Sequence, residues 1–272
     1  MTLWLIWWFA IGTFIGSFLN VCIYRLPREQ SIVRPRSHCP HCRRTIAWHD
    51  NVPILSYLLL RARCRHCGKP IHWRYPVVEA LTGALTAWTF ARFGLTPQAV
   101  VYAVFLWALI VASGIDFEFQ IIPDEISIGG LVVGLVVSGL MPQLHGTAAP
   151  LVALKRSVLG AVVGGGALYL TGLFGTLVFR KEAMGGGDVK LLAMAGSILG
   201  WKLVTLAFFL APLLAIIPGL AVLLWKRSHV IPYGPFLSMA LVLSLFIGQR
   251  LLDMSGVEES FSMLWQYYRQ GG

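Results

Sequence analysis

Eight apolar runs follow one another along the chain, and they restrict its fold more than any other feature of the sequence. They cover residues of about 3–24, 76–93, 97–115, 125–141, 156–179, 189–200, 203–225 and 231–250. A helix that crosses a bilayer needs roughly 20 residues. The run at 189–200 is short, so it is expected to be partly embedded or to continue into its neighbours. The sequence predicts an all-α polytopic membrane protein with about eight transmembrane helices.

The overall composition supports a membrane protein. Hydrophobic residues make up 57% of the 272 residues and charged residues 12%, whereas a soluble domain is about 45–50% apolar and about 25% charged. The net charge of +10 raises the question of nucleic acid. Half of the Lys and Arg residues lie in one loop between two apolar runs, where membrane topology explains them better. We therefore expect membrane lipid, and no nucleic acid, as a partner.

Basic residues beside the runs predict the orientation of the chain. No Lys or Arg precedes the run at 3–24, which also lacks the small-residue cleavage site of a secretory signal. Because Arg25 and Arg28 follow it, we expect an uncleaved span with its N-terminus outside. Lys155 and Arg156 fall outside in this scheme and are its exception. Four later basic residues fall in the cytoplasm: Arg180, Lys181, Lys226 and Arg227.

A loop at 25–75 interrupts the apolar pattern. It holds 11 of the 22 Lys and Arg residues, against only Glu29 and Asp50 as acidic residues. It also holds two Cys-x-x-Cys pairs with 21 residues between them. Two such pairs can complete a tetrahedral zinc site. The expected ligands are Cys39, Cys42, Cys64 and Cys67.

Other uses of these cysteines fit less well. Disulfides are disfavoured because the loop is predicted to lie on the reducing side of the membrane, and a redox pair would stand alone near a βαβ pattern. Three histidines, His38, His41 and His66, could replace a ligand or be exposed. A four-cysteine site leaves no open position for water. The zinc is therefore expected to be structural and to fold a loop with little hydrophobic core.

Two aspartates stand at the ends of apolar segments. Asp116 ends the run that begins near 97, and Asp188 follows Gly185, Gly186 and Gly187. A carboxylate at membrane depth usually faces a wet cavity or a partner and serves a function. Asp116 could be a catalytic acid or base, an ion-path carboxylate or an interfacial residue. Asp188 could be functional, or it could cap a helix after a flexible turn.

The two carboxylates could form a catalytic pair. Three glycines before Asp188 allow unusual backbone angles and the close approach of a peptide. If the carboxylates meet, one can activate a water while the other, protonated, polarises a carbonyl. Asp124 follows Pro123, so it could cap a helix or support this site. The alternatives are a transporter or proton path that uses Asp116 and Asp188, and a non-enzymatic docking protein.

Four stretches of the sequence together resemble the bacterial type IV prepilin peptidases. They begin with Gly16-Ser-Phe-Leu-Asn20-Val-Cys-Ile-Tyr-Arg25-Leu-Pro27 and continue through the cysteine loop from Ser37 to Thr82. The other two are IDFEFQIIPDEIS and GGGDVKLLAMAG, which are similar to the two aspartyl-protease motifs of that family. The resemblance runs from near residue 12 to about residue 250.

The resemblance implies a GxGD-type intramembrane aspartyl protease and N-methyltransferase of the bacterial inner membrane. Asp116 and Asp188 would be catalytic, and S-adenosylmethionine would be a cofactor. The substrates would be prepilins of type IV pili or pseudopilins of type II secretion, cut after Gly on the cytoplasmic side. Four segments follow: a first transmembrane helix (1–24), a zinc-binding loop associated with methylation (25–75), a peptidase core (76–250) and a tail (251–272).

The loop departs from the family at two places. Family members commonly have Gly at Ala62 and Tyr-Glu at His49-Asp50. Asn20 and Glu79 are our candidates for the cofactor site, although both residue types also form hydrogen bonds at helix ends. Three acidic residues are candidates to meet a basic leader: Glu118, Glu125 and Glu182.

Overall fold

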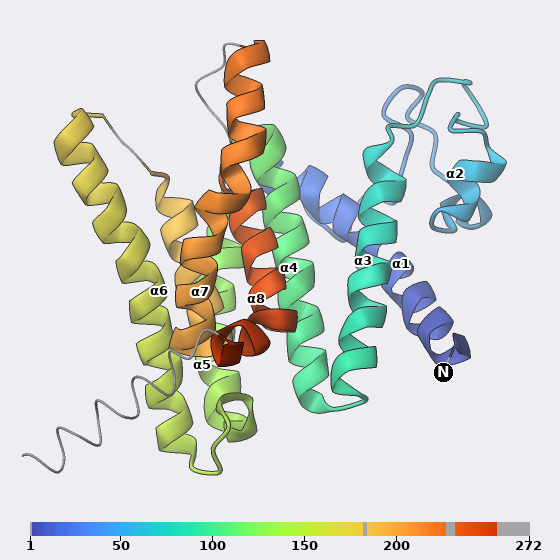
Figure 1. Ribbon diagram of the computed structural model, residues 1–272. Coiled ribbons are helices and arrows are strands. Elements are labelled where there is room, and N and C mark those ends of the chain that lie inside the picture. The colour runs from blue at the N-terminus through green and yellow to red at the C-terminus, as the bar shows by residue number, and fades with distance from the viewer. Residues whose placement is uncertain (1, 182–183, 227–231, 255–272) are drawn as a thin grey trace, which may run out of the picture. The chain divides into compact units, whose positions relative to one another are not determined.

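The computed structural model describes residues 2–181, 184–226 and 232–254 (Figure 1). Within these ranges β-structure is limited to two isolated bridges. The α-helices are α1 (Thr2–Arg25), α2 (Leu55–Leu59), α3 (Arg74–Phe93), α4 (Pro97–Phe119), α5 (Asp124–Leu140), α6 (Pro150–Phe179), α7 (Gly186–Lys226) and α8 (Gly234–Met254). Short 3₁₀ helices are η1 (Leu26–Arg28), η2 (Trp48–Asn51) and η3 (Pro142–His145). The predicted all-α class is confirmed.

The predicted number of spans is not confirmed. Every predicted apolar run coincides with a helix or with half of α7. Among the described residues, four helices are long and apolar enough to cross a membrane: Thr2–Arg28, Pro97–Phe119, Pro150–Phe179 and Gly234–Met254. Polar residues such as Arg74, Glu79 and Arg92 make α3 less apolar, and α5 has only 17 residues. The chain is thus a polytopic membrane protein with four clear candidate spans.

Helix α7 is broken at Gly200, the last residue of the apolar run at 189–200. Gly200 has φ 80° and ψ 169°, a conformation that side chains disfavour. Three residues earlier, the carbonyl of Ser197 accepts hydrogen bonds from the hydroxyls of Ser157 (2.7 Å) and Ser138 (3.2 Å). These two buried serines, from α6 and α5, hold the helix in place beside the break.

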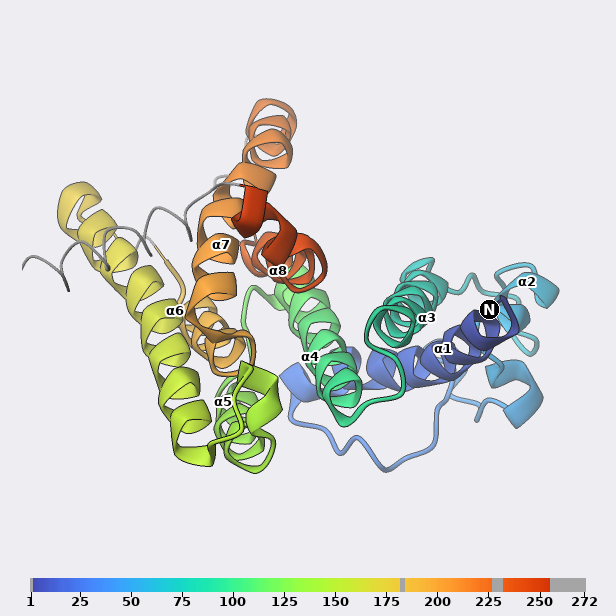
Figure 2. The same cartoon turned by 60° about the horizontal axis from the view of Figure 1, so that its bottom comes forward.

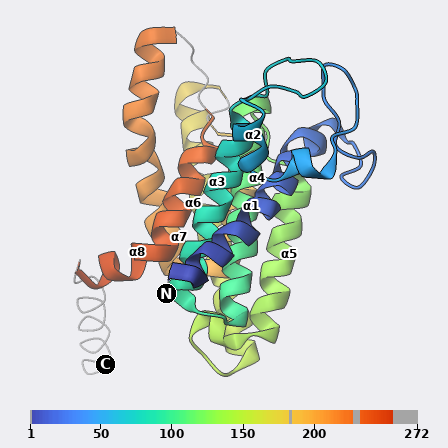
Figure 3. The same cartoon turned by 90° about the vertical axis from the view of Figure 1, so that its right-hand side faces the viewer.

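The described chain forms two compact units, residues 1–130 and 131–272. In the first unit α1 crosses α3 (Figure 3). A Cβ atom at Gly12 or Gly16 would overlap the α3 backbone at Gly83 or Glu79. Small residues at these positions therefore let the two helices approach closely.

In the second unit α6 and α7 run side by side (Figure 2). A Cβ atom at Gly160 would overlap the carbonyl of Gly196, and one at Gly164 would overlap that of Leu192. The opposite face of α6 exposes many large apolar side chains, as expected of a helix that contacts lipid.

Candidate active site and metal centre

Each Cys-x-x-Cys pair lies in a tight turn of its own. In the first turn, the N–H of Cys39 donates to the carbonyl of Arg44 (2.9 Å), and the N–H of Arg43 donates to that of Cys39 (2.8 Å). The same two bonds recur 25 positions later, with lengths of 2.9 Å. The equivalent residues there are Cys64, Lys69 and Gly68. The loop therefore contains a local structural repeat that its sequence shows only through the cysteines.

The two turns bring the four predicted ligands together. The sulfur atoms of Cys39, Cys42, Cys64 and Cys67 all lie within 4.8 Å of one another, and those of Cys39 and Cys67 are 3.9 Å apart. Tetrahedral zinc with bonds of about 2.3 Å separates its sulfur ligands by about 3.8 Å, whereas a disulfide joins them at about 2.05 Å. The cluster can therefore hold a metal ion, and its spacing suits one better than disulfides.

The environment of the thiols also suits a cation. Hydrogen bonds from the backbone N–H groups of Cys67 and His66 lower the pKa of Cys64 to about 7. At Cys67 the N–H of Lys69 acts in the same direction, but burial and the neighbouring cysteines outweigh it and raise the pKa to about 11. Close thiols cannot all ionise next to one another, and a bound divalent cation removes that conflict.

The two turns share a left-handed backbone position but have different residues there. Arg43 has φ 58° where the second turn has Gly68 at φ 66°. A side chain in this left-handed conformation costs about 1–2 kcal/mol. We expect Arg43→Gly to stabilise the loop by about 0.5–1 kcal/mol, since the greater freedom of unfolded glycine offsets part of the gain. The midpoint of thermal metal release measures the change.

The reverse substitution provides a matched comparison. Gly68→Ala places a side chain at φ 66°, where its Cβ meets no atom within 4 Å, so only the backbone conformation is changed. It should lower the same midpoint, with a loss of about 1 kcal/mol. If Arg43→Gly and Gly68→Ala shifted the midpoint of metal release in the same direction, this explanation of the turns would be wrong.

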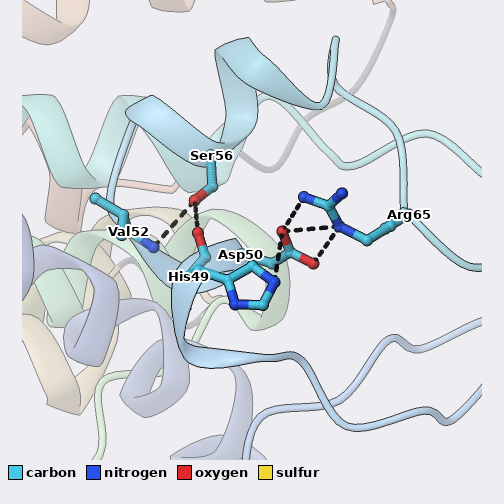
Figure 4. Close-up of polar contacts among 5 residues, drawn as sticks. All are labelled: His49, Asp50, Val52, Ser56 and Arg65. Carbon is cyan, nitrogen blue, oxygen red and sulfur yellow. Dashed lines mark hydrogen bonds and ion pairs between the residues drawn. The ribbon is translucent and has the colours of Figure 1, made fainter.

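Polar contacts shape the segment between the turns (Figure 4). The buried Ser56 hydroxyl accepts from the N–H of Val52 (3.1 Å) and donates to the carbonyl of His49 (3.0 Å), which ties η2 to α2. Asp50 accepts three hydrogen bonds of 2.6–3.0 Å from Arg65. These bonds lower the pKa of the Asp50 carboxyl. Asp50, one of the two departures from the family, thus joins η2 to the second turn.

Asn20 lies near the end of α1 and Glu79 near the start of α3, where these helices meet the loop. Both side chains are buried. Asn20 donates to the carbonyls of Gly16 (3.2 Å) and Tyr75 (3.1 Å), and its Oδ1 has no hydrogen-bond partner. Glu79 accepts a 2.7 Å hydrogen bond from the N–H of Ile54, the residue before α2. The structure therefore places both candidates where the loop joins the helices.

The backbone at Ile54 is strained. Ile54 has φ 60° and ψ −50°, a conformation that a β-branched residue rarely adopts. The N–H of Leu55 donates to the carbonyl of Pro53, which completes a γ-turn of the rarer, strained type. Strain of this kind persists where the surroundings impose it and often marks functional sites. Here Glu79 provides one of those constraints.

Asp116 is buried in the last turn of α4. Two residues later, Glu118 forms ion pairs with Arg28 (3.2 Å) and with Arg74. Glu118 is therefore already paired with two arginines, one at the end of η1 and one at the start of α3. It is less available to bind a basic leader than the sequence suggests. Asp124 and Glu125 are exposed in the first turn of α5, and Glu182 lies outside the described residues.

Asp188 lies in the first turn of α7, where its N–H donates to the carbonyl of Gly185 (3.2 Å). None of the three preceding glycines has a positive φ, so the expected unusual angles are not used here. A Cβ atom at Gly186 would meet no neighbour within 4 Å, which leaves open space beside the backbone. Burial and the charge of Asp188 raise the pKa of Tyr233 to about 12.

Comparison with known proteins decides the family. Residues 10–93 match the bacterial peptidase A24 N-terminal domain, and residues 103–220 match the type IV leader peptidase family. A prepilin leader peptidase/N-methyltransferase of Stutzerimonas stutzeri is 33% identical over 270 residues, covering 89% of this chain and 90% of the relative. The chain belongs to the type IV leader peptidase family. The first matched region contains the cysteines, and the second contains Asp116 and Asp188.

Further relatives of the leader peptidase family carry the same name. The prepilin leader peptidase/N-methyltransferase of Pseudomonas putida is 35% identical, and the match covers 85% of this chain and 86% of the relative. That of Myxococcus xanthus is 39% identical over 216 residues, which span 79% of this chain and 62% of the relative. None of the solved structures matches the chain at a significant level.

Several residues that contact the candidate sites are not indicated by the sequence. Tyr233 precedes α8 and lies outside the motifs that carry the family resemblance, and its one local signal is an aromatic residue between Pro232 and Gly234. Arg65 gave no signal because it is one of many basic residues in the loop. The contact between Ile54 and Glu79 joins positions 25 apart, which no local pattern predicts.

Proposed function

We propose that this chain is a prepilin leader peptidase of a bacterial inner membrane that also methylates the new N-terminus. The family membership carries this proposal, because the matched regions include every motif assigned a role above. In it, residues 1–24 are the first span, 25–75 the zinc loop, 76–250 the peptidase core and 251–272 a tail, of which 255–272 lie outside the described residues.

The proposed cleavage uses Asp116 and Asp188. One carboxylate takes a proton from water, whose oxygen attacks the carbonyl carbon of the leader's last glycine, while the other carboxyl donates a proton to the carbonyl oxygen. The C–N bond then breaks, the departing nitrogen receives the proton from the first carboxyl, and a hydroxyl of the tetrahedral intermediate returns its proton to the second. The products are the leader's new carboxylate and the new amine of the pilin. Asp124 and the three glycines before Asp188 would support the site.

The proposed topology places this chemistry where the substrate is. If α3 and α5 cross the membrane as well as α1, α4 and α6, an N-terminus outside would put the end of α4 and the start of α7 at the cytoplasmic face. A prepilin or pseudopilin whose apolar helix is still in the membrane presents its leader junction at that face. A transporter would instead be expected to hold its carboxylates near the middle of the membrane, between repeated halves.

The methyltransferase site is proposed at Asn20 and Glu79. S-adenosylmethionine, when bound, would supply the methyl group as an electrophile. A buried carboxylate and a buried, unpartnered amide oxygen are suited to orient a cationic group or an amine. Glu79 would hold the amine and accept its proton, while Asn20 would orient it. Zinc would be structural, with Cys39, Cys42, Cys64 and Cys67 as its ligands.

Substitution of Glu79 distinguishes its proposed role in methylation from its structural hydrogen bond with Ile54. Glu79→Gln retains an oxygen that can accept the hydrogen bond from Ile54, but it removes the charge. We expect about 10²-fold slower methylation, the usual contribution of a proton-transfer group, with cleavage nearly unchanged. Glu79→Ala also removes the acceptor and should loosen the loop. Normal methylation by the Gln variant would remove Glu79 from the site.

The function itself is tested by incubating membranes that contain the native chain with a prepilin. Mass spectrometry should detect a product that begins directly after the leader glycine and that gains a methyl group when S-adenosylmethionine is added. A prepilin with that glycine replaced by a bulky residue serves as the control. No cleavage in membranes with folded protein would reject the peptidase and return transport to consideration.

A further inference from the structure

The cysteine loop exposes large apolar side chains although it is not a membrane span. Trp48 is 79% exposed and Leu59 is 74% exposed, and Leu55 and Leu58 are also exposed. We call these four residues the loop apolar face. A contiguous exposed apolar surface usually marks an interaction site.

The loop apolar face is organised by helix spacing and by a buried serine. Leu55, Leu58 and Leu59 have the i, i+3, i+4 spacing that puts them on one side of α2. Ser56 is buried on the other side, and its hydroxyl donates to the carbonyl of His49. Trp48 directly precedes His49, so it lies next to the residue that contacts α2. The three leucines therefore share one face of α2, and Trp48 is exposed in η2 beside His49, the residue that Ser56 of α2 contacts.

The depth of α2 is set by its contact with α3. The N–H of Ile54, directly before α2, donates to the carboxylate of Glu79. Glu79 follows Arg74, the first residue of α3, by five positions, which corresponds to about 7–8 Å along the helix. Figure 1 shows α2 level with this end of α3 rather than beyond it. An interfacial helix buries its apolar face about 5–10 Å into the headgroup and acyl boundary.

Charge specifies the surface that this face would meet. The loop holds 11 basic residues and two acidic ones, and one of the acidic residues, Asp50, is already paired with Arg65. Arg61 and Arg63 follow α2 directly and are exposed. Basic residues beside a membrane are attracted to anionic lipid headgroups, and tryptophan is enriched at the interface.

We propose that the loop apolar face is inserted into the headgroup region of an anionic membrane surface. Trp48 and the three leucines of α2 enter the boundary with the acyl chains, and Arg61 and Arg63 contact lipid phosphates. The inserted face fixes the loop against the bilayer at the level of Glu79. This surface depends on the chain being a membrane protein, but not on either proposed catalytic activity.

A label at Leu59 tests the insertion. The full chain carries a polarity-sensitive fluorescent amino acid in place of Leu59, or of the exposed Lys69 as the control, in nanodiscs of phosphatidylglycerol and phosphatidylcholine. A lipid with a nitroxide near the top of its acyl chain is the quencher. Since an inserted face lies within reach of that nitroxide, we expect at least about twofold stronger quenching at position 59 than at position 69.

The same label tests the role of charge and the other occupants. Arg61→Gln combined with Arg63→Gln, or nanodiscs of phosphatidylcholine alone, should reduce quenching at position 59. Equal quenching at positions 59 and 69 would overturn the proposal. So would an apolar emission spectrum at position 59 without quenching by lipid, because a protein surface would then cover the face. Quenching that does not depend on charge would reject the anionic surface.

Discussion

Replacing Asp116 or Asp188 by asparagine is expected to lower the rate of leader cleavage by at least about 10³-fold, because each carboxyl would take part in proton transfer. Asparagine has nearly the same size as aspartate but cannot accept or donate the proton. The measurement is the initial rate of prepilin cleavage in membranes at matched expression. Binding of the uncut prepilin should remain, since neither substitution changes the volume of the site.

Asp253→Asn is a suitable control for both variants. Asp253 is exposed near the end of α8 and accepts a hydrogen bond from Gln249 (3.1 Å), so its substitution removes a carboxylate without affecting the proposed site. It should cleave at the native rate. A near-native rate in either the Asp116 or the Asp188 variant would show that the two do not act as a catalytic pair. The transport alternative would then be tested by proton or solute flux.

Loss of one cysteine from the cluster is expected to remove the metal and to unfold the loop. Between residues 26 and 73 only Cys39, Pro53 and Ser56 are buried, so the loop has almost no hydrophobic core. Structural zinc contributes about 10–16 kcal/mol of binding free energy in zinc-finger peptides. Cys67→Ser should therefore lose nearly all bound zinc and make residues 26–73 sensitive to protease.

The matched control for the cluster is Cys22→Ala. Cys22 is buried in α1, outside the cluster, so this variant should bind zinc as the native chain does. Elemental analysis of the purified protein and limited proteolysis measure the two effects. Native protease resistance after complete chelation would contradict a structural metal, because the loop would then be stable without it.

Much of the fold follows from the sequence because each apolar run overlaps most of a helix or half of α7. Even the break in α7 is indicated, because Gly200 is the last residue of the run at 189–200 and the next run begins at 203. The number of spans is not confirmed beyond four, because only four helices of the described residues are long and apolar enough to cross a membrane. In α3, polar residues such as Glu79 lower the hydropathy, although Glu79 accepts its hydrogen bond from Ile54 within the protein.

The metal centre was predictable and the loop around it was not. Cysteine spacing determines which side chains can share an ion, because each pair is held by its own turn. The position of the loop against α3 depends on the hydrogen bond between Ile54 and Glu79, and the closure of η2 on α2 depends on Ser56. Such contacts form between segments that have no common period, so a linear pattern contains no sign of them.

The repeated turns of the loop have a consequence for the order in which the metal is captured. Each turn is shaped by hydrogen bonds internal to it, so each can form as a preorganised two-thiol chelator before any ion arrives. An ion held by Cys64 and Cys67 would keep open coordination positions until Cys39 and Cys42 close over it. Assembly by two half-sites makes the intermediate open to exchange and the final four-thiolate state slow to dissociate. The speed of loop maturation would then depend on the rate at which the second turn meets the first.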